Sequence, residues 1–179
     1  MNFFSKNLFL FYICVFSLAS CASSKPEQRD DRVNLPPPHI NCPEDGDCSF
    51  EILKNSVLKI NYDSHGKMYP EIVEGDKIVI KYHYKKKTHD NVMDDSYSEY
   101  VYLEFDPKEK QVILKDKDLS KAKMIFGRIC YCKGAMGYFP IKEGSLFLFN
   151  LDNSLQIRTS FKISKVPQVI HQIDENIKY

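Results

Sequence analysis

Strict alternation of apolar and polar residues marks the stretch Leu155-Gln156-Ile157-Arg158-Thr159-Ser160-Phe161-Lys162-Ile163. Its odd-numbered positions carry four large apolar side chains and Thr159, while its even-numbered positions are polar or charged. Successive side chains of a β-strand point to opposite faces of a sheet, so this period of two predicts a strand with one buried face. An amphipathic helix would need a period near 3.6.

The same alternation recurs upstream, in residues 78–85 and 100–105. Shorter candidate strands cover residues 50–54, 57–62, 68–73, 111–115, 124–132, 137–142 and 146–151. Turn-forming residues separate them at Asn55-Ser56, Asp63–Gly66, Glu74–Asp76, Asp106–Lys108, Glu143-Gly144 and Asp152-Asn153. Many short strands joined by tight turns predict a mainly β fold with little helix, arranged as a single antiparallel β-sandwich or barrel-like domain.

Helix signals are weak. Residues 118–123 are compatible with one helical turn. Near the C-terminus, Val166, Ile170, Ile173 and Ile177 have helical spacing, but Pro167 and the β-branched residues also allow a final strand. We therefore expect either a helix or a strand there.

The N-terminus has the parts of a secretory signal. Lys6 supplies positive charge, an apolar run extends from Leu8 to Leu18, and Ala19 and Ser20 are small. The run is shorter than the roughly 20 apolar residues that a membrane-spanning helix needs. It predicts a signal peptide over residues 1–20.

The sequence Leu18-Ala19-Ser20-Cys21 resembles the lipobox of bacterial lipoproteins. That resemblance implies a diacylglycerol on the Cys21 thiol, cleavage before Cys21 and acylation of the new amino group. Two or three acyl chains together hold a protein stably at a membrane. The alternative is an ordinary cleaved signal in which Cys21 is incidental.

Location follows from the same resemblance. Ala22, rather than Asp, after the lipidated cysteine favours the outer membrane, and Asp30-Asp31 leaves open whether the protein faces the periplasm or the cell surface. Residues 21–41 then form the lipidated cysteine and a flexible tether, because they are rich in Ser, Pro and charge. Residues 42–179 are long enough for one β-rich globular domain.

Charge argues against nucleic acid as a partner. Without the leader, which contains Lys6 and no acid, the chain has 24 basic and 24 acidic residues. The cluster Lys85-Lys86-Lys87 reads as a solvated loop or, alternatively, as a contact to lipid headgroups.

Four cysteines remain besides Cys21 in the exported chain: Cys42, Cys48, Cys130 and Cys132. Export favours disulfides. Within a continuous strand Cys130 and Cys132 share a face, and a bond between them closes a very small ring. We therefore expect Cys42 and Cys48 each to pair with Cys130 or Cys132, and the Cys42–Cys48 loop to cover Arg128 near the surface. The less favoured readings are a four-thiolate zinc site and a redox-active Cys130-Tyr131-Cys132 dithiol.

No residue is predicted to be catalytic, to ligate a metal or to bind a cofactor. The acids Glu44, Asp45 and Asp47 are expected to be solvated, because their spacing departs from that of calcium loops. The histidines are scattered, at positions 39, 65, 83, 89 and 171. The aromatic residues are expected mainly in the core, but sugar stacking is an alternative for Tyr100, Tyr102, Tyr131 and Tyr138.

The blocks from Phe126 to Gly134 and from Cys42 to Cys48 resemble uncharacterised lipoproteins of Flavobacterium-type bacteria, a resemblance that brings no activity with it. The expected function is therefore that of a lipid-anchored, non-catalytic lipoprotein of the bacterial envelope. Its partners would be the membrane, through Cys21, and another envelope component. The alternatives are a glycan- or small-ligand-binding lipoprotein and, less favoured, an extracytoplasmic hydrolase.

Overall fold

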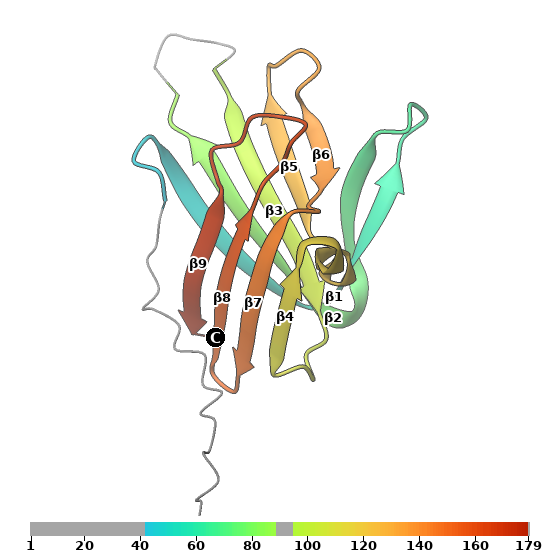
Figure 1. Ribbon diagram of the computed structural model, residues 1–179, viewed down its shortest axis with the longest axis vertical. Coiled ribbons are helices and arrows are strands. Elements are labelled where there is room, and N and C mark those ends of the chain that lie inside the picture. The colour runs from blue at the N-terminus through green and yellow to red at the C-terminus, as the bar shows by residue number, and fades with distance from the viewer. Residues whose placement is uncertain (1–41, 89–94, 179) are drawn as a thin grey trace, which may run out of the picture. The chain divides into compact units, whose positions relative to one another are not determined.

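Two antiparallel sheets make up the part of the computed structural model that is described, residues 42–88 and 95–178 (Figure 1). The five-stranded sheet has the order β1-β2-β3-β5-β6, with bounds Gly46–Tyr62, Met68–Lys86, Tyr97–Phe105, Ile125–Cys130 and Gly137–Pro140. The four-stranded sheet has the order β4-β7-β8-β9, with bounds Gln111–Lys115, Gly144–Leu151, Ser154–Phe161 and Gln172–Lys178. The predicted mainly β, antiparallel and sandwich-like fold is confirmed.

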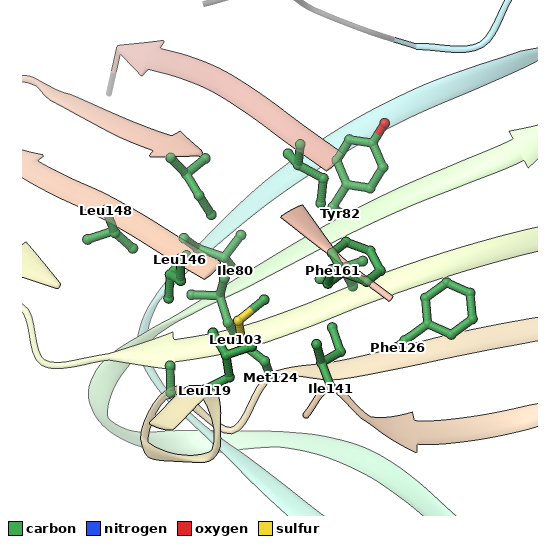
Figure 2. Packing of buried hydrophobic residues seen from close by; sticks show 14 of the residues in the cluster. Ile80, Tyr82, Leu103, Leu119, Met124, Phe126, Ile141, Leu146, Leu148 and Phe161 are labelled. Carbon is green, nitrogen blue, oxygen red and sulfur yellow. The ribbon is translucent and has the colours of Figure 1, made fainter. Parts of the chain in front are cut away.

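The core lies between the two sheets. In β8 the predicted alternation is observed, with Leu155, Ile157, Thr159 and Phe161 buried. The three apolar ones belong to one cluster with Ile80 and Tyr82 of the five-stranded sheet and Leu146 and Leu148 of β7 (Figure 2). Burial of this shared face is the main force that holds the sheets together.

The short helical turn η1, Asp116–Ala122, begins two residues before the predicted one and closes the same core with Leu119 and Ala122. Lys123 ends it in the left-handed conformation, with φ of 45°. Among the described residues no helix is long and apolar enough to cross a membrane.

Strands β1 and β2 are longer than predicted, because the expected turns at Asn55-Ser56 and Glu74–Asp76 are wrong. Both positions lie opposite each other inside one long hairpin, where the register shifts around Ser56 and Asn55 has φ of 53°. A β-bulge of this kind bends a hairpin without ending it. Gly75 is required at the bend, because a Cβ atom there would lie 2.1 Å from Val57.

Beyond this bend, residues 56–62 and 68–74 form the distal hairpin, which lies beside β6 (Figure 1). Its Leu58 is fully buried with Val79, Tyr102 and Ile125 in a second, smaller apolar cluster. The second cluster contains members of β2, β3 and β5 that lie on the face of the five-stranded sheet turned away from the main core. The distal hairpin therefore covers part of that outer face.

A charged clamp fixes the base of the distal hairpin. The Glu104 carboxylate accepts the Leu58 backbone N–H at 2.8 Å and pairs with the Lys123 ammonium at 2.7 Å. The same ammonium donates to the Leu58 carbonyl at 2.9 Å. Because Glu104 is nearly buried, this pairing offsets the cost of removing its charge from water.

The C-terminal segment is a strand, so the helical alternative is wrong. Residues 162–171 cross over without regular strand or helix, with Val166 and Ile170 in the core, and the chain then pairs with β8 as β9. Pro167 cannot donate a helical hydrogen bond, and Gln168 instead bonds to the carbonyls of Phe161 and Ile170, at 3.2 and 2.8 Å.

Candidate functional site

The disulfides join neighbours along the chain, Cys42 to Cys48 and Cys130 to Cys132. Participation of all four cysteines in disulfides is confirmed, but the predicted pairing between the two segments is wrong. Strand β5 ends at Cys130 rather than at residue 132, and the chain bends at Tyr131. Cys132 therefore leaves the strand, and its sulfur can reach that of Cys130.

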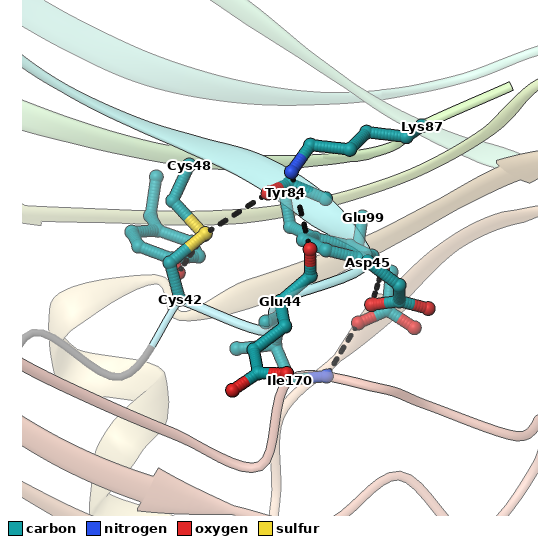
Figure 3. The surroundings of a disulfide bond; sticks show 10 residues. Cys42, Glu44, Asp45, Cys48, Tyr84, Lys87, Glu99 and Ile170 are labelled. Carbon is teal, nitrogen blue, oxygen red and sulfur yellow. Dashed lines mark hydrogen bonds between the residues drawn. A yellow bond between two sulfur atoms is a disulfide. The ribbon is translucent and has the colours of Figure 1, made fainter.

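The first bridge closes a tight turn at the start of β1 (Figure 3). The Gly46 N–H donates to the Pro43 carbonyl at 3.1 Å, which brings Cys42 back beside Cys48. The run Pro43-Glu44-Asp45-Gly46 is a turn signal that could have indicated this local bridge. Gly46 is required because a Cβ atom would lie 2.1 Å from the Tyr84 ring.

The acidic loop between Cys42 and Cys48 is fastened to the domain. The Tyr84 hydroxyl donates to Asp45 Oδ1 at 2.9 Å, and the Tyr82 hydroxyl donates to Cys48 Sγ at 2.9 Å. Lys87 donates through its backbone N–H to the Asp45 carbonyl and through its ammonium to the Glu44 carbonyl. The carboxylates themselves are on exposed residues, and the described residues hold no group of three potential metal ligands.

Arg128 is not where the sequence placed it. Its residue is only 9% exposed, and it contacts the loop of residues 131–136 rather than the Cys42–Cys48 turn. Its guanidinium donates to the Ala135 carbonyl at 2.9 Å and to the Tyr97 hydroxyl at 3.2 Å, and lies 5.1 Å from the centre of the Tyr97 ring. Arg128 does share a face with Cys130, but this is the core face of β5 rather than a surface covered by the Cys42–Cys48 loop.

Sequence reasoning missed Glu99, whose residue is fully buried in β3. Its carboxylate accepts the backbone N–H groups of Val169 and Ile170, each at 2.7 Å, and the hydroxyl of Tyr97. Burial and the hydrogen bond to Glu99 raise the pKa of Tyr97 to about 12. One signal was available in the sequence. Glu99 lies two positions before Val101 and so continues the apolar face of the strand predicted over residues 100–105, where a charged residue is unusual.

Three of the four candidate sugar-stacking tyrosines lie together on the outer face of the five-stranded sheet, where the Tyr102 ring stacks with that of Tyr100 and meets that of Tyr138 edge-on. Tyr102 is buried beneath the distal hairpin, while Tyr100 stacks on His83 with ring centres 4.4 Å apart. The Tyr138 ring lies over Gly127, where a Cβ atom would be 2.6 Å from it. Tyr131, in contrast, is 81% exposed on its own loop.

The other polar candidates are dispersed. His65 lies in the exposed turn of the β1–β2 hairpin, His171 is exposed before β9, and His39 and His89 lie outside the described residues. Burial, followed by the charges of Lys81 and Lys85, lowers the pKa of His83. The expected loop at Lys85–Lys87 is wrong, because Lys85 and Lys86 end strand β2 and pair with β1, although Lys85 and Lys87 are exposed. The lipid site Cys21, the signal peptide and the tether also lie outside the described residues.

One cavity of about 290 Å³ lies at the bend of the long hairpin. Lys77, Glu104, Asp106, Glu109 and Lys121 line it together with the apolar Phe105, Val112, Leu114 and Ala122. Lys77 and Asp106 form an ion pair across 2.8 Å. This hydrogen-bonded pairing raises the pKa of Lys77 and lowers the pKa of Asp106.

Exposed apolar side chains collect on the distal hairpin. Tyr62 is 65% exposed, Tyr69 44% and Ile60 36%. Ile60 and Tyr62 lie on one face of the ribbon with their partners Pro70 and Met68. Tyr69 pairs with Asn61, so its ring lies on the opposite face. Both faces of the distal hairpin therefore carry exposed aromatic or aliphatic side chains.

Comparison with known proteins gave no relative: no family model, no curated protein and no solved structure matches the chain.

Proposed function

We propose that the protein is a lipid-anchored, non-catalytic envelope lipoprotein that binds another envelope protein through its distal hairpin. The observation that carries the proposal is the set of exposed side chains at the end of this hairpin, Ile60, Tyr62 and Tyr69. Tyrosine is enriched in protein interfaces because it buries a large ring and keeps a polar hydroxyl at the edge.

The distal hairpin is presented in a fixed orientation. Leu58 is held by the Glu104–Lys123 clamp and by the second apolar cluster, so the base of the ribbon does not depend on a partner. A surface that is ordered before binding loses less conformational entropy when a partner docks.

The backbone of the same ribbon favours a protein partner. Residues 57–62 of β1 pair with β2 alone, and residues 68–73 of β2 pair with β1 alone, within the described chain. Both edges of the ribbon therefore offer N–H and C=O groups to an added strand. A β-strand or β-hairpin of another envelope protein could use these groups at an edge of the ribbon, where Tyr62 on one face and Tyr69 on the other would flank it.

Site-specific photo-crosslinking in intact cells tests this contact. The full chain would carry a benzophenone amino acid at position 62 or 69, and at position 113 as the matched control. Ile113 is comparably exposed, at 48%, on β4 of the other sheet. We expect one discrete protein adduct from the hairpin positions that is absent at position 113. No adduct at positions 62 and 69, or the same adduct at position 113, would contradict the proposal.

The anchor is proposed on the lipobox-like sequence that ends at Cys21. We expect Cys21→Ser to lose fatty-acid labelling and to leave an unprocessed precursor or a protein released from membranes. Cys14→Ser, inside the leader, is the control and should be labelled like the natural chain. Unchanged labelling of Cys21→Ser would exclude a lipid at this position.

A small-ligand function is the second candidate, and the cavity at the hairpin bend favours it. Its apolar wall and its mixed lysine and carboxylate groups suit a small ligand that carries both charged and apolar parts. Leu114→Trp should fill the cavity and abolish binding of such a ligand while leaving crosslinking at position 69 intact. Retained ligand binding in Leu114→Trp would exclude the cavity as the ligand site.

A further inference from the structure

We infer that the Cys130–Cys132 disulfide is a thiol–disulfide exchange site that accepts electrons from a protein dithiol. This activity goes beyond the proposed binding function and does not depend on it. The bridge encloses a single residue, Tyr131, and lies where β5 gives way to an exposed loop. Closing so short a loop removes little entropy from the unfolded chain, so the bond contributes little to folding and can open without unfolding the domain.

The two sulfur atoms belong to residues of different exposure. Cys130 is 7% exposed at the end of β5, whereas Cys132 is half-buried and starts the next turn, in which the Ala135 N–H donates to its carbonyl. An attacking thiolate therefore reaches Cys132 more readily, and Cys130 becomes the leaving group.

Positive charge lies on the leaving-group side. Arg128 precedes Cys130 by two positions on the core face of β5, and Lys133 directly follows Cys132. Both hydrogen bonds of the Arg128 guanidinium go to uncharged oxygens, those of Ala135 and Tyr97. The Glu99 carboxylate, directly opposite Arg128 in the β3–β5 ladder, is hydrogen-bonded to the N–H groups of residues 169 and 170 and to the Tyr97 hydroxyl. A nearby cation stabilises a thiolate and so promotes its departure.

The second bridge provides a contrast inside the same molecule. Between Cys42 and Cys48 lie three carboxylates, on Glu44, Asp45 and Asp47. Negative charge there disfavours both an approaching thiolate and a departing one. The Tyr82 hydroxyl also donates to Cys48 Sγ, so the bridge is fastened to β2. We therefore assign it a structural role.

The proposed reaction is balanced. A thiolate of the reduced partner attacks Cys132 Sγ, forms a mixed disulfide with it and releases the Cys130 thiolate. The second partner thiolate then attacks the partner's own sulfur and releases the Cys132 thiolate. Two electrons pass from the partner dithiol to the Cys130–Cys132 bond, and the two protons lost by the partner are taken up through water by the released thiolates.

The test compares the two bridges in the natural full chain, purified in mild detergent. The protein would be equilibrated in glutathione buffers of graded [GSH]²/[GSSG], alkylated and mapped by peptide mass. We expect Cys130–Cys132 to be half-reduced at a ratio at least about 100-fold lower than Cys42–Cys48. Half-reduction of both at the same ratio, or of Cys42–Cys48 first, would overturn the assignment.

Variants test the activity itself with a short Cys-x-x-Cys peptide as the electron donor. We expect the natural chain and Cys42→Ser/Cys48→Ser to oxidise one equivalent of peptide, and Cys130→Ser/Cys132→Ser to oxidise none. Cys130→Ser alone leaves Cys132 as a free thiol and should likewise oxidise no peptide. Arg128→Gln should slow the exchange about tenfold and Arg128→Lys should restore it, with thermal unfolding of both measured as a check on folding. Equal rates in Arg128→Gln and the natural chain would exclude the guanidinium from the reaction.

Discussion

The buried carboxylate of Glu99 accepts the backbone N–H of Ile170 at 2.7 Å, joining residues that are 71 positions apart in the sequence. Its other oxygen accepts the N–H of Val169 at the same distance. The crossover between β8 and β9 has no sheet ladder to satisfy these two donors within the described chain. One side chain of β3 thus takes the place of a strand partner and fixes the crossover over the end of the core (Figure 3).

Glu99→Gln should destabilise the domain by about 2–4 kcal/mol. An amide has one oxygen and cannot accept both N–H groups through two oxygens, and the bonds that remain lose their charge assistance. Urea unfolding measures the change in free energy of unfolding. Glu109→Gln, on an exposed residue, is the matched control and should change it by less than about 0.5 kcal/mol. Similar values for the two variants would show that the buried carboxylate is not needed.

Lys123→Met should loosen the distal hairpin and leave the main core intact. The change removes the partner of Glu104 and the donor to the Leu58 carbonyl. It keeps a non-glycine residue at the positive φ of this position, so the backbone cost stays the same. Amide exchange should accelerate at least about tenfold in residues 57–62, with no change in β8.

The control for this variant is Lys121→Met, which breaks the exposed pair between Lys121 and Asp118. Surface pairs of this kind contribute little, so we expect no change in exchange of the hairpin amides. If Lys123→Met slows or leaves unchanged the exchange of residues 57–62, the clamp does not hold the hairpin.

Gly127→Ala should cost about 1–3 kcal/mol in the free energy of unfolding, because the new methyl group would lie 2.6 Å from the Tyr138 ring. Tyr138→Ala removes the obstacle, so the alanine at position 127 should cost at least about 1 kcal/mol less in that background. Gly134→Ala serves as the control, since no atom lies within 4 Å of its Cβ position. Gly134→Ala should change the free energy of unfolding by the same amount with or without the Tyr138 ring. If the effects of Gly127→Ala and Tyr138→Ala are simply additive, the proposed contact between Cβ and ring is contradicted.

Local patterns were sufficient to find most of the strands, although not all of their ends. The period of two from Leu155 to Phe161 depends on one buried face, which a sequence displays directly. The bend at Asn55-Ser56 was misread as a turn because a residue with positive φ serves equally well in a turn and in a bulge. Whether such a residue makes a turn or a bulge depends on whether the segment after it can pack against another part of the fold. Here Leu58 packs against β2, β3 and β5, so the hairpin continues.

The site residues were less accessible to sequence reasoning for a related reason. The pairing of the cysteines depended on where β5 ends, and a break after Cys130 is set by the loop that follows rather than by its apolar pattern. Glu99 acquires its partners from residues 169–170, which no local pattern connects to it. Tyr62 and Tyr69 are exposed because the hairpin extends beyond the sheet. The sequence did not predict this extension, because the bend at Asn55-Ser56 was taken for a turn that ends the strand.

Alkaline pH should unfold the domain through its buried tyrosines. Burial, followed by the charges of Glu175 and Glu99, raises the pKa of Tyr82 to about 12. Tyr97 reaches about 12 through burial and its hydrogen bond to Glu99. In the unfolded chain a tyrosine ionises near pH 10. Below pH 10 both the folded and the unfolded state keep these protons, so the free energy of unfolding does not change with pH through these groups. Between about pH 10 and pH 12 only the unfolded state releases them, so the free energy of unfolding falls as pH rises.

Urea unfolding at increasing pH, with phenolate absorbance followed in the folded state, measures this dependence. Tyr82→Phe and Tyr97→Phe should each make the fall in unfolding free energy between pH 10 and pH 12 less steep. Tyr62→Phe is the matched control, because this ring is exposed on the distal hairpin, and it should leave the slope unchanged. Removal of a titrating hydroxyl must remove its share of the proton release. If the free energy of unfolding falls equally steeply with pH in all three variants, groups other than Tyr82 and Tyr97 cause the alkaline transition.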